Sequence, residues 1–237
     1  MIDLFIRSIR IDHGLLPPDC YSEEIPALKK LTTLSFHRPV TFFTGENGSG
    51  KSTLIEAMAI AYGFNPEGGT RNYHMSTQDT HSPLYQAISF IRSAKRPKWG
   101  YYMRGESFYN IASFNNAYAD GKQPDYHIRS HGQGMLEAMQ DNMSPQSIYF
   151  FDEPESALSP SRQLTLLKEI SDYASMGCQF IIATHSIILL SLPEAEILSF
   201  DNEEIEPIGY EQTPAYRLTS LFINHRDRIL RQVLTDE

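Results

Sequence analysis

The sequence of 237 residues predicts an α/β fold with a mostly parallel sheet. Two short apolar runs, residues 147–151 and 179–183, have the composition of buried strands, and an amphipathic pattern over residues 161–174 predicts a helix between them. A third β-rich run, residues 39–44, leads through a glycine-rich loop into a helical pattern over residues 52–62. Strands that alternate with helices usually pair in parallel, because each helix returns the chain to the same end of the sheet.

The segment before the glycine-rich loop is expected to form short strands joined by a polar loop. Residues 5–11 alternate loosely between apolar and polar side chains, as a half-buried strand does. Residues 14–26 contain three prolines and several polar residues, which indicates a loop.

The middle of the chain has a different composition, rich in Gly, Asn, Ser, Tyr and His. Only short helical patterns are visible here, over residues 84–91 and 135–139. We therefore expect a single domain, residues 1–237, with an inserted, partly helical lobe at about residues 65–145. Beyond residue 183 we expect a helix near Ser186, an acidic hairpin over residues 201–206, and a final helix from about residue 215 to 234.

Composition and charge exclude several classes of protein. The hydrophobic fraction of 41% excludes wholesale disorder, and a net charge of −9 argues against coating nucleic acid by bulk electrostatics. The two cysteines lie far apart in sequence, which fits neither a disulfide framework nor a zinc knuckle and favours a reduced, cytoplasmic compartment. The N-terminus lacks the apolar core of a signal peptide. The most apolar stretch, residues 180–192, is too short and too interrupted for a membrane span.

The glycine-rich loop fits the pattern G-x-x-x-x-G-K-[ST] through Gly45, Gly50, Lys51 and Ser52. In this pattern glycines let backbone N–H groups converge on a phosphate, the lysine reaches the β- and γ-phosphates, and the serine hydroxyl binds Mg²⁺. A glycine turn with a surface lysine is the plainer alternative, but a strand before the loop and a helix after it favour phosphate binding. The expected nucleotide contacts are Gly45, Glu46, Asn47, Gly48, Ser49, Gly50, Lys51, Ser52 and Thr53.

Two further motifs follow apolar strands. Asp152 and Glu153 come directly after one strand, where Asp152 is expected to hold Mg²⁺ and Glu153 to act as the general base on the attacking water. His185 closes the next strand, at the end of an α/β sheet where ligands bind, and could hydrogen-bond the γ-phosphate. The plainer alternatives are a solvent-facing acid pair and a histidine at the edge of the core.

Together these motifs resemble the ATP-binding-cassette ATPase heads, in which Ser156–Ser159 stands at the D-loop and Ser130–Gly134 at the signature. The signature differs from that of transporters, and the run from Asp152 to Glu155 is closer to the branch around SMC, RecF and the overcoming-lysogenization-defect ATPases. Within that branch the chain resembles the small stand-alone bacterial AAA family ATPases.

This resemblance implies ATP and Mg²⁺ as cofactors, with hydrolysis of ATP to ADP and phosphate involving Lys51, Glu153 and His185. It implies an ATP-dependent, head-to-tail homodimer in which Ser130 and Gly132 of one subunit contact the γ-phosphate bound by the other. The Q-loop glutamine, a further Mg²⁺ ligand, is either Gln78 or Gln86. A separate effector protein is the expected partner. The alternatives are the ATPase subunit of a transporter and a regulatory module that binds nucleotide without hydrolysing it.

One short segment is basic and aromatic, which suits stacking and backbone contacts on single-stranded nucleic acid. A solvated turn or a protein-docking surface would show the same composition. The basic residues are Arg92, Lys95, Arg96, Lys98 and Arg104, with Trp99, Tyr101 and Tyr102 between them.

Overall fold

The computed structural model describes residues 4–70, 82–105 and 131–234. These residues form a seven-stranded sheet whose five inner strands, from β9 to β6, are parallel, with an antiparallel strand at each edge. In sheet order the strands are β10 (Glu206–Pro207), β9 (Glu196–Ser199), β3 (Val40–Thr44), β8 (Gln179–Ala183), β7 (Ser147–Asp152), β6 (Trp99–Arg104) and β4 (Gly69–Thr70). The predicted α/β class with a mostly parallel sheet is confirmed.

The inner strands are apolar on both sides because both faces of the sheet are covered. Every residue of β3, β7 and β8 is buried, as in the strands of other parallel sheets. Successive side chains point to opposite faces, so Phe150 and Ile181 belong to one core and Phe151 and Ile182 to the other.

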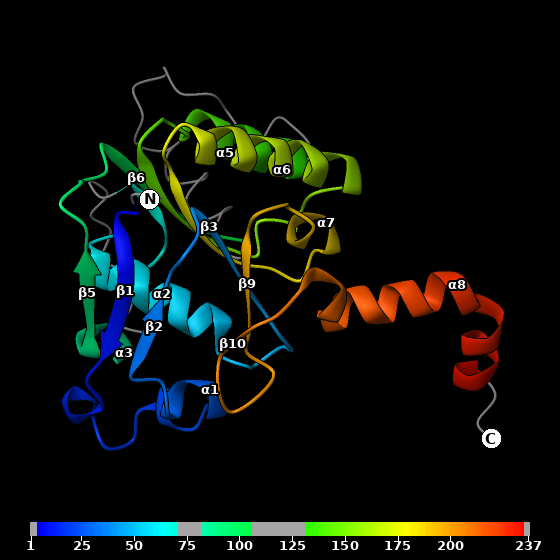
Figure 1. Ribbon diagram of the computed structural model, residues 1–237, viewed down its shortest axis with the longest axis horizontal. Coiled ribbons are helices and arrows are strands. Elements are labelled where there is room, and N and C mark those ends of the chain that lie inside the picture. The colour runs from blue at the N-terminus through cyan, green and yellow to red at the C-terminus, as the bar shows by residue number, and fades with distance from the viewer. Residues whose placement is uncertain (1–3, 71–81, 106–130, 235–237) are drawn as a thin grey trace.

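Helices cover the two faces unequally (Figure 1). On one face lie α5 (His131–Asp141), α6 (Pro160–Ser175) and the short α7 (Ile187–Leu190). On the other lies α2 (Lys51–Tyr62), packed between the large sheet and a small antiparallel sheet. The small sheet has the order β2 (Thr33–Ser35), β1 (Ile6–Ile11), β5 (Ile88–Arg92).

Short helical segments make up the rest of the body. They are η1 (His13–Leu15), η2 (Tyr21–Glu23), α1 (Pro26–Lys29), α3 (Leu84–Ala87) and η4 (Tyr210–Gln212). The last described element, α8 (Pro214–Leu234), extends away from the body (Figure 1). Within the described ranges no helix is long and apolar enough to cross a membrane. Both cysteines are buried and unpaired.

The expected inserted lobe differs from what the structure shows. Residues 88–92, expected at the end of a helix over 84–91, form β5 and pair with β1, so the helix ends at Ala87. Residues 99–104 form β6, an inner strand paired with β7. Long-range strand pairing overrides local helix preference here. Strand β4 also falls in the expected lobe and pairs with β6. Three strands of the expected lobe therefore belong to the sheets of the body.

Candidate functional site

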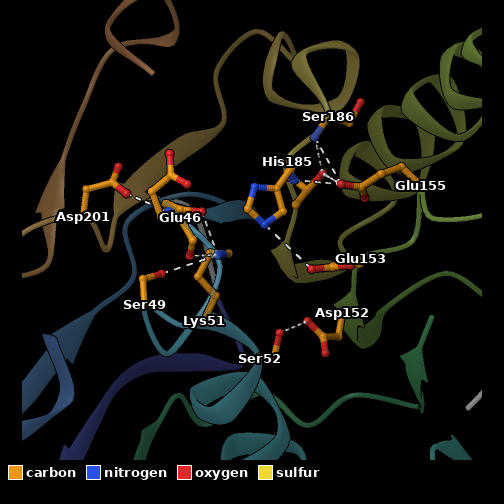
Figure 2. Close-up of polar contacts among 12 residues, drawn as sticks. Glu46, Ser49, Lys51, Ser52, Asp152, Glu153, Glu155, His185, Ser186 and Asp201 are labelled. Atoms are coloured by element: carbon orange, nitrogen blue, oxygen red, sulfur yellow. Dashed lines mark hydrogen bonds and ion pairs between the residues drawn. The ribbon is translucent and has the colours of Figure 1, made fainter. Parts of the chain in front are cut away.

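The carboxyl ends of four neighbouring strands meet at one edge of the large sheet. The loop of residues 45–50 follows β3, Asp152 and Glu153 end β7, His185 follows β8, and Asp201 follows β9. Ligands of open α/β sheets bind outside this edge. The parallel register, with Asp152 opposite Ala183, brings the predicted residues together (Figure 2).

The loop folds tightly around the Lys51 ammonium group. Lys51 Nζ donates to the carbonyl oxygens of Gly45 (2.7 Å) and Glu46 (2.8 Å), inside the loop that is expected to hold phosphate. Burial lowers the pKa of Lys51, and the carboxylates of Glu153 and Asp152 oppose that shift. The helix begins directly after Gly50, whose φ of +101° favours glycine. Lys51 Nζ also donates to the Ser49 hydroxyl at 3.4 Å (Figure 2). The loop therefore presents a buried cation held by neutral oxygen atoms, a group that a phosphate could engage.

Ser52 and Asp152 are joined by a direct hydrogen bond. Ser52 Oγ donates to Asp152 Oδ1 at 2.8 Å, linking the first turn of α2 to the end of β7 (Figure 2). The pKa of Asp152 is raised to about 6: burial is the main cause, the Ser52 hydrogen bond opposes it, and the Glu153 carboxylate adds to it. A hydroxyl and a carboxylate oxygen are ligands that Mg²⁺ prefers, and a divalent cation would offset the cost of burying the charge. The pair therefore fits a magnesium site.

No cluster of three or more His, Cys, Asp or Glu side chains suited to a metal occurs within the described ranges. A cation at Ser52 and Asp152 would therefore need further ligands of another kind. Mg²⁺ commonly completes its coordination with water and substrate phosphate oxygens, so such a site is consistent with metal that binds together with a nucleotide.

Glu153, the residue after Asp152, faces His185 (Figure 2). His185 Nε2 lies 3.7 Å from Glu153 Oε1, too far for a direct hydrogen bond, and Nε2 is buried without a hydrogen-bond partner in the described structure. Glu153 has a φ of +48°, and its backbone N–H donates to the carbonyl of Ala183 at 3.0 Å. A non-glycine residue in this conformation is strained, so the contact with β8 helps to hold its carboxylate at the site.

Glu155 supports the His185 segment from behind and was not predicted as a site residue. Its Oε1 accepts from the Thr184 hydroxyl (2.7 Å), the His185 N–H (2.7 Å) and the Ser186 N–H (3.1 Å). Burial raises the pKa of Glu155, and the hydrogen bonds from Thr184 and His185 act against that shift. Glu155 extends the acidic motif in the sequence, but only the fold shows that it positions the backbone at His185.

Asp201 contacts the start of the glycine-rich loop and was also not predicted as a site residue. Its Oδ1 accepts from the Glu46 N–H at 2.7 Å, and its Oδ2 accepts from the Ser199 hydroxyl at 3.0 Å. In the sequence Asp201 was one of several acids of a predicted hairpin, with no signal that separated it from the others. The parallel pairing of β9 with β3 places it beside the loop.

A cavity of about 270 Å³ opens over the inner side of the loop. An exposed aromatic ring, Tyr21 of η2, lies at this cavity, although sequence analysis identified no aromatic residue here. The remaining lining residues were all predicted as site residues: Asn47, Gly48, Gly50, Lys51, Ser52, Thr53 and Glu153.

Comparison with known protein families shows to which family the chain belongs. A family model described as an AAA domain matches residues 24–174, more than half of the chain, from α1 to α6. The chain belongs to the AAA domain family. The match confirms the P-loop ATPase resemblance drawn from the motifs at Gly45–Thr53 and Asp152–Glu153.

The solved structures that match this AAA domain protein have low sequence identity to it. The SMC head domain from Thermotoga maritima has a TM-score of 0.47 and 15% identity, covering 87% of this chain and 100% of its own. An inward-facing ABC transporter assigned to the metal-chelate type has a TM-score of 0.43 and 16% identity, covering 81% of each chain. No curated protein sequence matches the chain.

For the remaining predicted site residues of this AAA domain, the structure gives either no placement or only the element in which they lie. Gln78 and Ser130 lie outside the described residues. Gly132 lies in the first turn of α5. The other Q-loop candidate, Gln86, lies in α3, where its amide donates to the Tyr85 hydroxyl at 3.2 Å.

The basic and aromatic segment does not form a single surface. Arg104 pairs with Glu56 of α2 at 3.1 Å, and the Arg92 guanidinium lies over the Tyr62 ring, 4.6 Å from its centroid. Tyr101 and Tyr102 are buried, so the prediction that they stack on nucleic acid is wrong. Strand β6 explains this, because an inner strand buries both of its faces. Of the predicted basic residues, Arg92, Arg96 and Lys98 are exposed.

Proposed function

We propose that this protein binds and hydrolyses ATP with Mg²⁺, and that ATP joins two copies head to tail. The observation that carries the proposal is the contact of Ser52 with Asp152 at 2.8 Å, beside a glycine-rich loop with a buried lysine. This arrangement provides an anion site and a hard-cation site side by side, as Mg·ATP requires.

Each residue then has a distinct task. The loop N–H groups and Lys51 bind the phosphates, and Ser52 and Asp152 hold Mg²⁺, which would neutralise charge on the phosphates. Glu153 accepts a proton from the attacking water, and His185 hydrogen-bonds the γ-phosphate. The separation of 3.7 Å between His185 Nε2 and Glu153 Oε1 supports this assignment, since it leaves both groups without a mutual hydrogen bond.

Dimer formation would follow from the same chemistry. The γ-phosphate offers charge-assisted hydrogen bonds that ADP lacks, so ATP would stabilise a closed pair more than ADP does. In this proposal Ser130 and Gly132 supply those contacts across the pair, and Gln78 is the additional Mg²⁺ ligand. The conversion of ATP to ADP would then release the pair and signal to a separate effector protein.

Glu153→Gln tests the proposal. The amide keeps the size of the side chain but cannot accept the proton, so we expect ATP turnover to fall by about 100-fold or more while ATP binding persists. The trapped ATP should shift the variant to a dimer in light scattering. Glu211→Gln, at an exposed glutamate of η4, is the matched control and should behave as the wild type. A wild-type protein with no Mg-dependent turnover, or a Glu153→Gln variant that remains monomeric with ATP, would contradict the proposal.

A further inference from the structure

Helix α8 exposes an apolar surface that nothing in the described structure covers. None of its 21 residues is buried, and it projects from the body (Figure 1). An exposed apolar surface of this kind marks an interaction site far more often than an isolated exposed side chain does. Its exposed large apolar residues are Leu218, Leu221, Phe222, Ile223, Val233 and Leu234.

The start of α8 is firmly attached to the body. Tyr210 donates from its hydroxyl to the carbonyl of Ile187 at 3.0 Å, and its ring packs edge-on against that of Tyr216 at 4.8 Å between centroids. Thr213 is fully buried and accepts the Tyr216 N–H through its hydroxyl at 3.3 Å. The helix is therefore an arm with a fixed root, and it bends at His225, where the backbone leaves helical geometry.

The charge of α8 is opposite to that of the body. The helix has four arginines and one aspartate, a net charge of +3, whereas the whole chain carries −9. The rest of the chain therefore carries −12. An anionic membrane would attract the arm but repel the body, whereas a second copy of this chain offers an acidic body to a basic arm.

The body has a surface suited to such an arm at the root of α8. A cavity of about 710 Å³ lies between α1, the outer side of the glycine-rich loop and the hairpin after β9. Its apolar lining residues are Pro26, Ala27, Phe200 and Pro214, of which Ala27 and Phe200 are nearly fully buried. Its acidic residues are Glu46, Asp201 and Glu203, the last paired with Lys30. The loop residues Asn47, Gly48 and Ser49 and the hairpin residue Asn202 complete the lining. Two more exposed acids of the hairpin, Glu204 and Glu206, extend the negative charge.

We propose that α8 is an arm that docks on the body of a second copy of this chain, so that the two copies exchange arms. Its apolar face would pack on the apolar lining of the partner's cavity, and its arginines would face the acidic hairpin. Because Pro214 lines the cavity, each arm leaves beside its own cavity, and a two-fold pair would place both arms on both bodies. The part of α8 before the bend at His225, residues 214–224, is about 16 Å long and carries Leu218, Leu221 and Phe222. This association needs no nucleotide, so it is separate from the ATP-dependent pairing proposed above.

Sedimentation velocity without nucleotide and with EDTA tests the arm. We expect the wild type to form a dimer, and Leu218→Ser with Phe222→Ser to weaken it by at least about tenfold, or about 1.4 kcal/mol. The matched control is Ser220→Ala with Asn224→Ala, two polar residues of the same helix, which should leave the dimer intact. Because α8 buries no residue in the single chain, circular dichroism should show an unchanged fold in both.

A charge exchange makes the test specific to an arm on a second copy. Arg226→Glu with Arg228→Glu makes the arm acidic, and Glu204→Lys with Glu206→Lys makes the hairpin basic. Each variant alone should be monomeric, because like charges then meet at both contacts. A mixture of the two should form a heterodimer, because opposite charges then meet at both contacts.

Three results would overturn the proposal. The first is a wild type that stays monomeric at about 100 µM, a concentration at which even weak association would be detected. The second is a dimer that survives all of the arm variants. The third is a monomer that sediments with phosphatidylserine vesicles through the arm. Lys51→Ala should leave the arm dimer unchanged even if it abolishes ATP-dependent pairing, so the two proposals can fail separately.

Discussion

Glu155 accepts three hydrogen bonds through one oxygen, and two of the donors are the backbone N–H groups of His185 and Ser186. The carboxylate lies on the far side of the strand end from the glycine-rich loop (Figure 2). Glu155 is therefore a positioning residue, which acts on the nucleotide through the placement of His185.

Glu155→Ala should lower kcat for ATP hydrolysis by about 10- to 100-fold, since small misplacements at an active site cost rate in this range. KM for ATP should change little, because the loop that binds the phosphates is untouched. Glu155→Gln keeps an acceptor oxygen and should restore most of kcat. Steady-state kinetics distinguish this from a purely structural role, which would lower the amount of folded enzyme and leave kcat per folded molecule unchanged.

Asp201 holds the N–H of Glu46, the second residue of the loop, and so affects binding rather than turnover. Asp201→Ala should weaken ATP affinity by about tenfold, the effect expected when a charge-assisted hydrogen bond is lost. Asp201→Asn, which keeps an acceptor, should bind more tightly than the alanine variant. Titration calorimetry in the Glu153→Gln background measures affinity without hydrolysis. A loss of turnover at unchanged affinity would contradict this assignment.

At the scale of elements, the apolar strands and the glycine-rich loop could be predicted from the sequence. The pairing of strands that lie far apart in the sequence could not. Strands β7 and β8 are continuous apolar runs, so burial on both faces was visible in the sequence. Strand β5 has only partly buried and exposed residues, and its pairing with β1 comes from a contact more than 70 residues away. For the same reason the contact of Asp201 with Glu46 could not be predicted, because only the packing of β9 on β3 brings the two together.

The segment η1–η2–α1 contains a pH-sensitive contact. His13 Nδ1 lies 2.6 Å from Glu23 Oε1, and Nε2 lies 2.9 Å from the carbonyl oxygen of Leu31. Burial lowers the pKa of His13, but the hydrogen bonds to Glu23 and Leu31 raise it more, so the net shift is upward. The protonated form is therefore favoured in the folded state.

The resulting stabilisation is complete below pH 6.5, the ordinary value for histidine, and is lost as the pH rises through the elevated pKa. We expect His13→Gln to lower the melting temperature more at pH 6 than at pH 8. Thermal unfolding of both proteins at the two pH values measures this. An equal loss at both pH values would show that His13 contributes only packing.

At the scale of the whole molecule, the strand order concentrates the chemistry. β9, β3, β8 and β7 are adjacent, so the residues that follow them meet at one edge although they are spread from Gly45 to Asp201. The Ser52–Asp152 contact joins α2 to the centre of the sheet, and a ligand bound there would connect both. Binding of Mg·ATP should therefore stabilise the fold as a whole.

At ATP concentrations near 100 times the dissociation constant, binding would add about 2.7 kcal/mol to the free energy of unfolding. For a domain of this size that corresponds to a rise in melting temperature of roughly 5–10 °C. With EDTA the rise should be much smaller, because the buried Asp152 carboxylate, whose pKa burial raises to about 6, would then face the phosphates without a cation between them. Asp152→Asn, which lacks that charge, should show nearly the same small shift with and without Mg²⁺. Scanning calorimetry of the two proteins decides the matter: an equal ATP shift in the wild type with and without Mg²⁺ would mean that Ser52 and Asp152 do not hold the metal.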